Sequence, residues 1–217
     1  MEILPSLISA DLLNLNSVIE SLNDHCDGFH IDVMDNHFVP NLTWGPAFID
    51  YFLKVSKKPL DVHLMVDNPE SFIPKLSLRV DDTLIFHFEA VKDKKEIENL
   101  ALRVQSMGWK VGLAIKPGTK FDDFAGFLRF FDQVLVMSVE PGFSNQKFIS
   151  KVLDKIKKIA QLKQDKQFPL KMAVDGGVNC ENIKLLVENG VDRVGVAGAI
   201  FSGDNYLQNL QKLYSAA

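Results

Sequence analysis

Two short strings in the sequence carry side chains that could bind a metal ion: FHIDVMD at residues 29–35 and DVHLMV at residues 61–66. Each is typical of the end of a buried strand, along which side chains alternate between two faces. His30 and Asp32 then share one face of the first strand, and His63 lies on a face of the second. Imidazole and carboxylate groups suit a first-row transition metal. The strings therefore predict a metal-dependent enzyme, with a further ligand from a third strand.

Short apolar runs alternate with amphipathic segments along the whole chain. The apolar runs are too short for helices and almost continuous, which is typical of strands in a parallel sheet. Strands are predicted at residues 3–8, 28–34, 60–66, 83–88, 110–115, 133–138, 170–174 and 193–197. Helices are predicted near residues 13–23, 46–55, 69–78, 94–107, 121–130, 147–163, 180–189 and 204–214.

Eight alternating units of this kind predict an α/β fold, a single TIM (β/α)8 barrel over residues 1–217. A doubly wound open sheet is the main alternative, and it is less favoured because no G-x-G-x-x-G follows the first strand. Residues 147–163 have the clearest helical spacing, with lysines expected on the solvent face. Asn179 is expected to cap the helix near residues 180–189.

The composition of the chain excludes several function classes. The 217 residues carry a net charge of −4, which favours neither nucleic acid nor an anionic membrane as a partner. Cys26 and Cys180 are far apart, which argues against a disulfide framework. No basic segment precedes the first apolar stretch, and no apolar run approaches the roughly 20 residues that span a bilayer. We therefore expect a cytoplasmic protein.

In a TIM barrel the active site lies at the C-terminal ends of the strands. Asp175 is expected there and is a further candidate ligand. Gly176 and Gly177 follow it, so their backbone amides could bind an anion such as a phosphate. His87 and Glu89 are assigned to the barrel interior or the end of the fourth strand. The other residues expected at strand ends are Ser9, Asp32, Met34, His63, Met65, Met137, Ser138 and Gly198.

The motifs of the chain, taken together, resemble the ribulose-phosphate 3-epimerase family. The matching strings are PSLISAD, FHIDVMDNHFVPNLTWGP, PLDVHLMV, VMSVEPGF with QKF, VDGGVN and VAGAIF, in collinear order over essentially the whole chain. The resemblance implies a TIM barrel that interconverts D-ribulose 5-phosphate and D-xylulose 5-phosphate in the pentose phosphate pathway. It also implies one divalent metal ion, which is zinc, iron, manganese or cobalt, and a homo-oligomer, either a dimer or a hexamer.

The resemblance assigns a role to individual residues. The implied metal ligands are His30, Asp32, His63 and Asp175, of which Asp32 and Asp175 also form the acid/base pair. The implied substrate contacts are Ser9, His63, Met34, Met65 and Met137. The implied phosphate side consists of the mobile loop Gly142, Phe143, Ser144 and Asn145, together with the turns at Gly176, Gly177, Gly198 and Ala199.

The phosphate side of the chain departs from the family pattern in two places. The loop reads PGFSNQ where the family usually has PGFGGQ, and the last turn reads VAGAIF where it usually has AGSAIF. These departures leave open a 3-epimerase for a six-carbon ketose phosphate, such as allulose 6-phosphate. A catalytically silent sugar-phosphate binder is the second alternative, and the intact acid/base residues argue against it.

Overall fold

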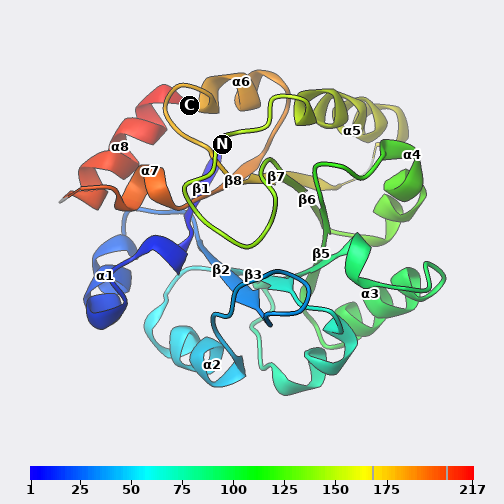
Figure 1. The fold of residues 1–217 in the computed structure, drawn as a ribbon, viewed down its shortest axis with the longest axis horizontal. Coiled ribbons are helices and arrows are strands. Elements are labelled where there is room, and N and C mark those ends of the chain that lie inside the picture. The colour runs from blue at the N-terminus through cyan, green and yellow to red at the C-terminus, as the bar shows by residue number, and fades with distance from the viewer. Residues whose placement is uncertain (168, 204) are drawn as a thin grey trace.

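The computed structural model describes residues 1–167, 169–203 and 205–217. Its strands form one parallel sheet, in the order β1-β8-β7-β6-β5-β4-β3-β2, that curls around a central axis (Figure 1). The strands are β1 (Glu2–Pro5), β2 (Phe29–Met34), β3 (Leu60–Met65), β4 (Thr83–His87), β5 (Lys110–Ile115), β6 (Gln133–Met137), β7 (Lys171–Asp175) and β8 (Arg193–Val196). This topology confirms the TIM barrel and excludes the doubly wound sheet.

The α-helices form a ring outside the strands (Figure 1). They are α1 (Leu15–Leu22), α2 (Pro46–Val55), α3 (Glu96–Ser106), α4 (Phe121–Phe124), α5 (Val152–Lys166), α6 (Ile183–Glu188), α7 (Gly198–Phe201) and α8 (Tyr206–Ala216). Among the described residues, none of the helices is long and apolar enough to cross a membrane. Cys26 and Cys180 are both free thiols, the first buried and the second exposed.

The barrel closes between β1 and β2 through a few contacts at the two ends of these strands. Ser6 and His30 form an isolated parallel bridge. Near the start of both strands, the Ile3 amide donates a 2.9 Å hydrogen bond to the Asp27 carboxylate. These contacts hold the strand that carries the first predicted metal ligands against the first strand of the chain.

The strand residues alternate between the outer core and the barrel interior, as the period of two predicts. The outward side chains pack against the helices in one large apolar cluster, which includes Ile31, Val62 and Leu64. The inward side chains form a smaller apolar cluster around Ile85 and Leu135. The interior is therefore a packed core, and many of its polar side chains gather toward its two ends.

The first strand is shorter than the sequence predicted. β1 ends at Pro5, and residues 7–9 turn into the 3₁₀ helix η1 (Leu7–Ser9) instead of continuing to residue 8. Proline fixes its own φ angle and lacks an N–H, which favours the edge or the end of a strand. Ser9 consequently does not end a strand.

Three helix predictions were also wrong in part. Residues 69–78 form only two 3₁₀ turns, η3 (Pro69–Ser71) and η4 (Ile73–Lys75), because Pro74 lacks the N–H that a continuous helix needs. Residues 121–130 form α4 followed by the 3₁₀ helix η6 (Ala125–Phe130). The helix predicted at residues 147–163 begins at Val152 and ends at Lys166.

One lysine of α5 and the start of α6 differ from expectation. Lys155 of α5 is buried, and its Nζ donates to the Lys116 carbonyl at 2.7 Å instead of facing solvent. Helix α6 begins at Ile183, so Asn179 does not cap it. The Asn179 side chain instead accepts a hydrogen bond from the Glu181 amide at 2.8 Å, which forms a local turn before the helix.

Candidate active site and metal centre

Parallel register brings the two histidine strings together. In the β2–β3 pair, Asp32 lies opposite His63, and His30 lies two residues before Asp32 on the same face. Asp175, the last residue of β7, reaches the same point from across the barrel. Gly195 of β8 makes this approach possible, because a Cβ there would lie 3.0 Å from Asp175 Oδ1 and 3.4 Å from His30 Cγ.

The four predicted ligands converge on one point. One ligand atom from each of His30, Asp32, His63 and Asp175 lies within 4.8 Å of the others. The distances of His30 Nε2 to Asp32 Oδ1 and Asp175 Oδ2 are 3.3 Å and 3.8 Å. Those of His63 Nδ1 to the same two atoms are 3.1 Å and 3.9 Å. Ligands held about 2.0–2.1 Å from a tetrahedral ion lie roughly 3.3–3.4 Å apart, so this donor set fits a divalent transition metal.

The cluster is electrostatically suited to a cation. Burial opposes ionisation of Asp32, yet the two imidazoles beside it hold the pKa of its carboxyl well below the usual range. Burial, reinforced by the Asp32 charge, raises the pKa of Asp175 to about 7. Burial would lower the pKa of His30, but the two carboxylates raise it to about 9. The carboxylates therefore favour a positive charge between them, which a divalent ion would supply.

A cavity of about 320 Å³ opens directly above this cluster, at the C-terminal ends of the strands. Asp32 and Asp175 line the cavity, whereas His30 and His63 are at most 1% exposed and lie behind them. The carboxylates can thus contact a bound molecule while the imidazoles contact an ion. The other predicted residues that line the cavity are Met34, Met65, Met137, Gly142, Phe143, Ser144, Asn145, Gly176, Gly177, Gly198 and Ala199.

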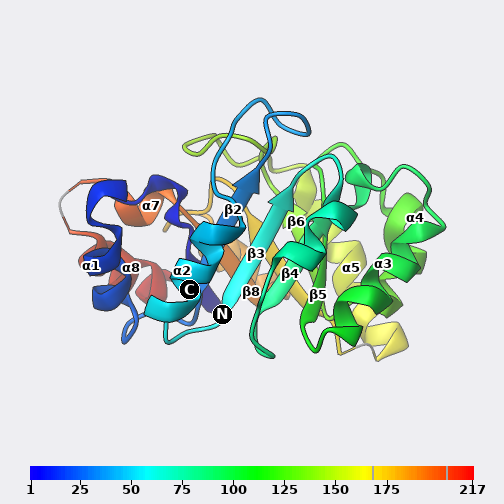
Figure 2. The same ribbon diagram turned by 90° about the horizontal axis from the view of Figure 1, so that it is seen from below.

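The loop after β6 lies across the mouth of the barrel, together with the loop after β2 (Figures 1 and 2). The Asn41 side chain donates a 2.8 Å hydrogen bond to the Gly142 carbonyl, which joins the two loops. Asn145 adopts a left-handed conformation with φ of 61°. Its side chain packs so closely on Gly198 that a Cβ at position 198 would overlap Asn145 Oδ1. The loop residue that departs from the family motif therefore lies against the turn after β8.

The Asp-Gly-Gly turn after β7 has the tight geometry that its sequence indicates. Gly176 and Gly177 have φ angles of 111° and 65°, in the left-handed region that favours glycine. A Cβ on Gly177 would lie 2.6 Å from the Phe148 amide nitrogen. Ser138 fixes the turn, because its Oγ donates to the Asp175 carbonyl at 3.0 Å. This turn directs Asp175 toward the cavity.

Sequence reasoning missed Ser6 and misplaced Ser9. Ser6 Oγ donates a 2.6 Å hydrogen bond to Asp32 Oδ2, and Ser6 lines the cavity. The available signal was the spacing of two between Leu4 and Ser6 within the strand predicted at residues 3–8, which places the two side chains on one face. Ser9 is not among the described residues that line the cavity. Its Oγ is buried and finds no hydrogen-bond partner within the described part of the chain.

Known proteins are similar to this chain in sequence and in fold. A family model described as the Ribulose-phosphate 3 epimerase family matches residues 2–201. A ribulose-phosphate 3-epimerase of Mycobacterium bovis is 36% identical over 203 residues, which cover 94% of this chain and 87% of that relative. One from Methanocaldococcus jannaschii is 38% identical over 213 residues, with coverages of 98% and 89%.

More distant solved structures share the barrel alone. Orotidine 5′-monophosphate decarboxylase from Sulfolobus solfataricus matches with a TM-score of 0.67 at 14% identity, covering 99% of this chain and 96% of that one. At this identity the similarity supports the architecture and carries no information about the reaction.

Proposed function

Because the chain belongs to the ribulose-phosphate 3 epimerase family, we propose that it interconverts D-ribulose 5-phosphate and D-xylulose 5-phosphate by inverting C3. This reaction belongs to the pentose phosphate pathway. The observation that carries the proposal is the placement of two carboxylates, Asp32 and Asp175, on strands from different sides of the barrel. Both line the same cavity.

Epimerisation at C3 of a 2-ketose removes a carbon-bound proton from one face and returns a proton to the other. One base on each face is the simplest arrangement for this inversion. In our proposal Asp32 takes the C3 proton of one epimer, and a 2,3-enediolate forms. Asp175 then delivers a proton to the opposite face, and the roles reverse in the back reaction.

His30, Asp32, His63 and Asp175 would hold the divalent ion. When bound, the ion supplies Lewis-acid stabilisation of negative charge that develops on the substrate oxygens. The chain itself supplies orientation, since Ser6 holds one oxygen of Asp32 while the other faces the imidazoles. Which metal is bound is left to metal analysis of the purified protein.

The remaining cavity residues would bind the sugar phosphate. The thioether side chains of Met34, Met65 and Met137 offer a polarisable apolar wall that limits water around the reacting carbon. Backbone amides at the Gly177 and Gly198 turns, with the loop of residues 142–145, are proposed to hold the phosphate. We retain Ser9 as a substrate contact, because a substrate hydroxyl would satisfy its buried Oγ.

The two-base proposal is tested by Asp32→Asn and Asp175→Asn in the metal-loaded protein. An amide cannot accept the C3 proton, so each variant should lose at least about 100-fold in kcat, the lower range for general acid–base catalysis. Exchange of the C3 proton with deuterated solvent is measured in parallel, starting from each epimer. Each variant should lose exchange from the epimer whose proton its missing carboxylate removes.

Two outcomes would contradict the proposal. Wild-type rates in either variant would exclude the two-base scheme, and substrate binding without turnover in the metal-loaded wild type would indicate a silent binder. Assays on allulose 6-phosphate check the substrate, since we expect a higher kcat/KM for the five-carbon ketose phosphate.

A further inference from the structure

A second pair of side chains lies directly behind the metal ligands. His87 ends β4, and Glu89 follows it in the 3₁₀ helix η5 (Phe88–Ala90). His87 is fully buried, and its Nε2 lies 2.8 Å from Nε2 of His63. On its other side, His87 Nδ1 lies 3.1 Å from Glu89 Oε2. Neither His87 nor Glu89 lines the cavity, and the pair contacts the proposed metal ligands through His63.

The direction of this hydrogen-bond chain follows from the chemistry of its members. Glu89 is ionised: burial opposes ionisation, but His87, Thr119 and the Lys116 amide lower the pKa of Glu89 to about 2. An ionised carboxylate only accepts, so His87 donates from Nδ1–H. The 2.8 Å separation of the two Nε2 atoms requires one donor and one acceptor, and a ring whose N–H is on Nδ1 accepts at Nε2. His63 must then donate from Nε2–H.

This direction decides which nitrogen of His63 can bind a metal. With the proton on Nε2, the lone pair of His63 lies on Nδ1, which faces Asp32 Oδ1 at 3.1 Å and His30 Nε2 at 3.3 Å. Without His87, the proton would be favoured on Nδ1, where Asp32 would accept it. That proton would have to leave before a metal could bind.

We propose that Glu89 and His87 are positioning residues that hold His63 in the tautomer whose Nδ1 lone pair faces the metal site. The inference deepens the proposed function, on whose metal site it rests. Hydrogen bonds from histidine ligands to carboxylates and other acceptors are a general means of fixing ring orientation and ligand basicity.

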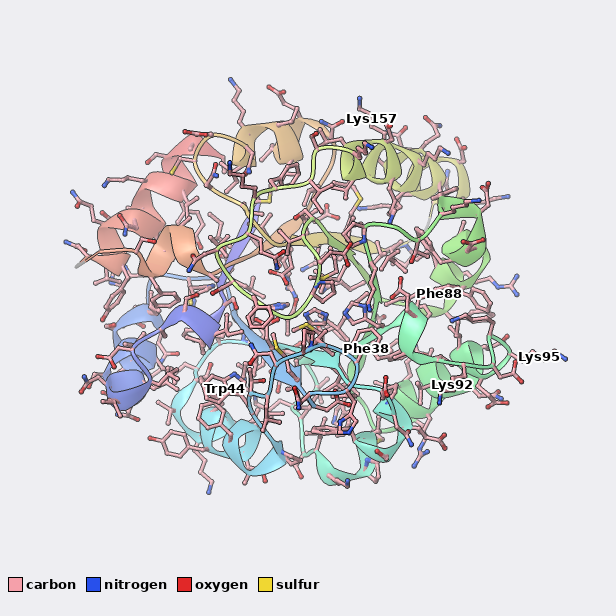
Figure 3. The ribbon with its side chains drawn as sticks, in the orientation of Figure 1. Phe38, Trp44, Phe88, Lys92, Lys95 and Lys157 are labelled. Atoms are coloured by element: carbon pink, nitrogen blue, oxygen red, sulfur yellow. The ribbon has the colours of Figure 1, made fainter. Side chains whose placement is uncertain are left out.

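The surroundings of the pair keep it rigid. Glu89 Oε1 accepts hydrogen bonds from the Lys116 amide, at 2.8 Å, and from the Thr119 hydroxyl. Phe38, on the loop that follows β2 (Figure 3), packs against His87 with ring centroids 4.8 Å apart and the ring planes tilted by 46°. The Lys116 Nζ lies 3.9 Å from the centre of the Phe38 ring. The chain Glu89–His87–His63 is therefore enclosed by loops that follow β2 and β5.

Nitrogen-15 NMR of the imidazole rings tests the tautomer directly in the full-length metal-free protein at neutral pH. In the wild type we expect His63 protonated at Nε2 and His87 at Nδ1. In Glu89→Gln the carboxylate acceptor is lost, and His63 should shift toward the Nδ1–H tautomer. Protonation of His63 at Nδ1 in the wild type would overturn the inference.

Titration with Co²⁺, followed by its visible absorption, measures the consequence for metal binding. Glu89→Gln should bind Co²⁺ roughly 10–100-fold more weakly, the usual cost of losing such a partner. The matched control Glu96→Gln removes the same charge from an exposed site on α3 and should stay within about twofold of wild type. Wild-type affinity in Glu89→Gln would also overturn the inference.

A pair of variants at position 87 separates positioning from packing. His87→Gln can present an amide oxygen to His63 Nε2–H and should retain most of the Co²⁺ affinity, whereas His87→Leu, which cannot, should lose it. Equal affinities for the two would contradict the inference. If the tautomer and the affinities behave as expected but the metal-loaded wild type does not epimerise ribulose 5-phosphate, only the proposed function fails.

Discussion

The negative charge of the buried Asp32 side chain depends on the groups that surround it. Its Oδ2 accepts a hydrogen bond from Ser6, and its Oδ1 lies 3.3 Å from His30 and 3.1 Å from His63. Only 4% of the residue is exposed, so water does little to stabilise its charge. The neighbouring groups must therefore stabilise this charge. A substitution of any one of them should alter the reactivity of Asp32 without removing its carboxylate.

Ser6→Ala tests this dependence. A hydrogen bond to a charged group is worth about 1.5–3 kcal/mol, so kcat/KM should fall roughly tenfold or more. The Ser6 hydroxyl stabilises the ionised form of Asp32, so its removal raises the pKa of that carboxyl. The acidic limb that Asp32 sets in the pH–kcat/KM profile should therefore move to higher pH, as measured by initial rates extended down to the lowest pH at which the protein stays folded.

Ser71→Ala, at an exposed position of η3, is the control and should leave the profile unchanged. An unshifted acidic limb in Ser6→Ala would mean that the Ser6 contact does not tune Asp32.

At the scale of elements, the loop after β6 and the turn after β8 are complementary. A family glycine is replaced by Asn145 in the loop, and the side chain of Asn145 fills the space beside Gly198. The turn can accommodate this side chain only because residue 198 has no Cβ. The loop and the turn are thus joined by a close contact between positions 145 and 198.

This contact predicts non-additive effects of substitution. Gly198→Ala should raise KM for the sugar phosphate about tenfold or more, because the new methyl group displaces Asn145 and the loop. Asn145→Gly in the same chain should recover most of this loss. A double-mutant cycle measures the coupling between positions 145 and 198. Additive effects of the two substitutions would show that the contact between Asn145 and Gly198 has no influence on the loop after β6.

Several elements were predictable from the sequence and others were not. Strand β5 and helix α2 were predicted at their observed bounds, because their apolar patterns end at clear polar or proline boundaries. The 3₁₀ turns at residues 69–75 and the late start of α6 were missed. Local pattern does not distinguish an α-helix from a 3₁₀ turn when tertiary contacts decide the path of the chain.

Across the whole molecule, many of the polar groups of the barrel interior lie toward its two ends. The end that opens into the cavity holds the histidines and aspartates of the proposed metal site. The opposite end, at the start of the strands, holds a network in which Arg193 bonds to Asp61 at 2.5 Å, to Gln133 at 3.1 Å and to Glu2 at 2.6 Å. Lys171 completes it with a 2.6 Å contact to Glu2. The Arg193–Glu2 bond joins the paired strands β8 and β1, whereas the other bonds join strands that are not neighbours in the sheet. The network therefore contributes to barrel closure.

Asp61→Ala should therefore lower stability without altering the chemistry. Arg193 would lose a buried partner, which costs about 3 kcal/mol or more, or roughly 6–12 °C in Tm. Thermal unfolding checks this, with kcat of the folded protein unchanged. Asp81→Ala, which breaks an exposed pair with Lys110, is the control and should change stability by less than about 0.5 kcal/mol. Equal effects of the two variants would contradict a closing role.

Removal of the metal should act on activity and stability together. The proposed ligands come from β2, β3 and β7, so a bound ion links opposite sides of the barrel. Chelation should abolish epimerisation, and metal at 100 times its Kd should restore about 2.7 kcal/mol of stability, or roughly 5–10 °C in Tm. An assay and a thermal melt before and after chelation measure both. Full activity after complete metal removal would exclude the metal from the reaction.

The sequence by itself determined the barrel, the inward direction of His30, Asp32 and His63, and the family to which these residues belong. Such features follow from short-range periodicity and from motifs that are contiguous along the chain. The compartment and the oligomeric state stay predictions.

Only the tertiary structure decided which distant side chains touch. Ser6 on Asp32, Asn145 on Gly198 and the line from Glu89 to His63 depend on strand register, on barrel closure and on loop paths. A contact of this kind involves residues far apart or on different strands, so no local pattern records it. For the same reason Ser6, and not Ser9, contacts the Asp32 carboxylate: β1 ends at Pro5, earlier than its apolar run suggests, and Ser9 lies in the 3₁₀ helix that follows.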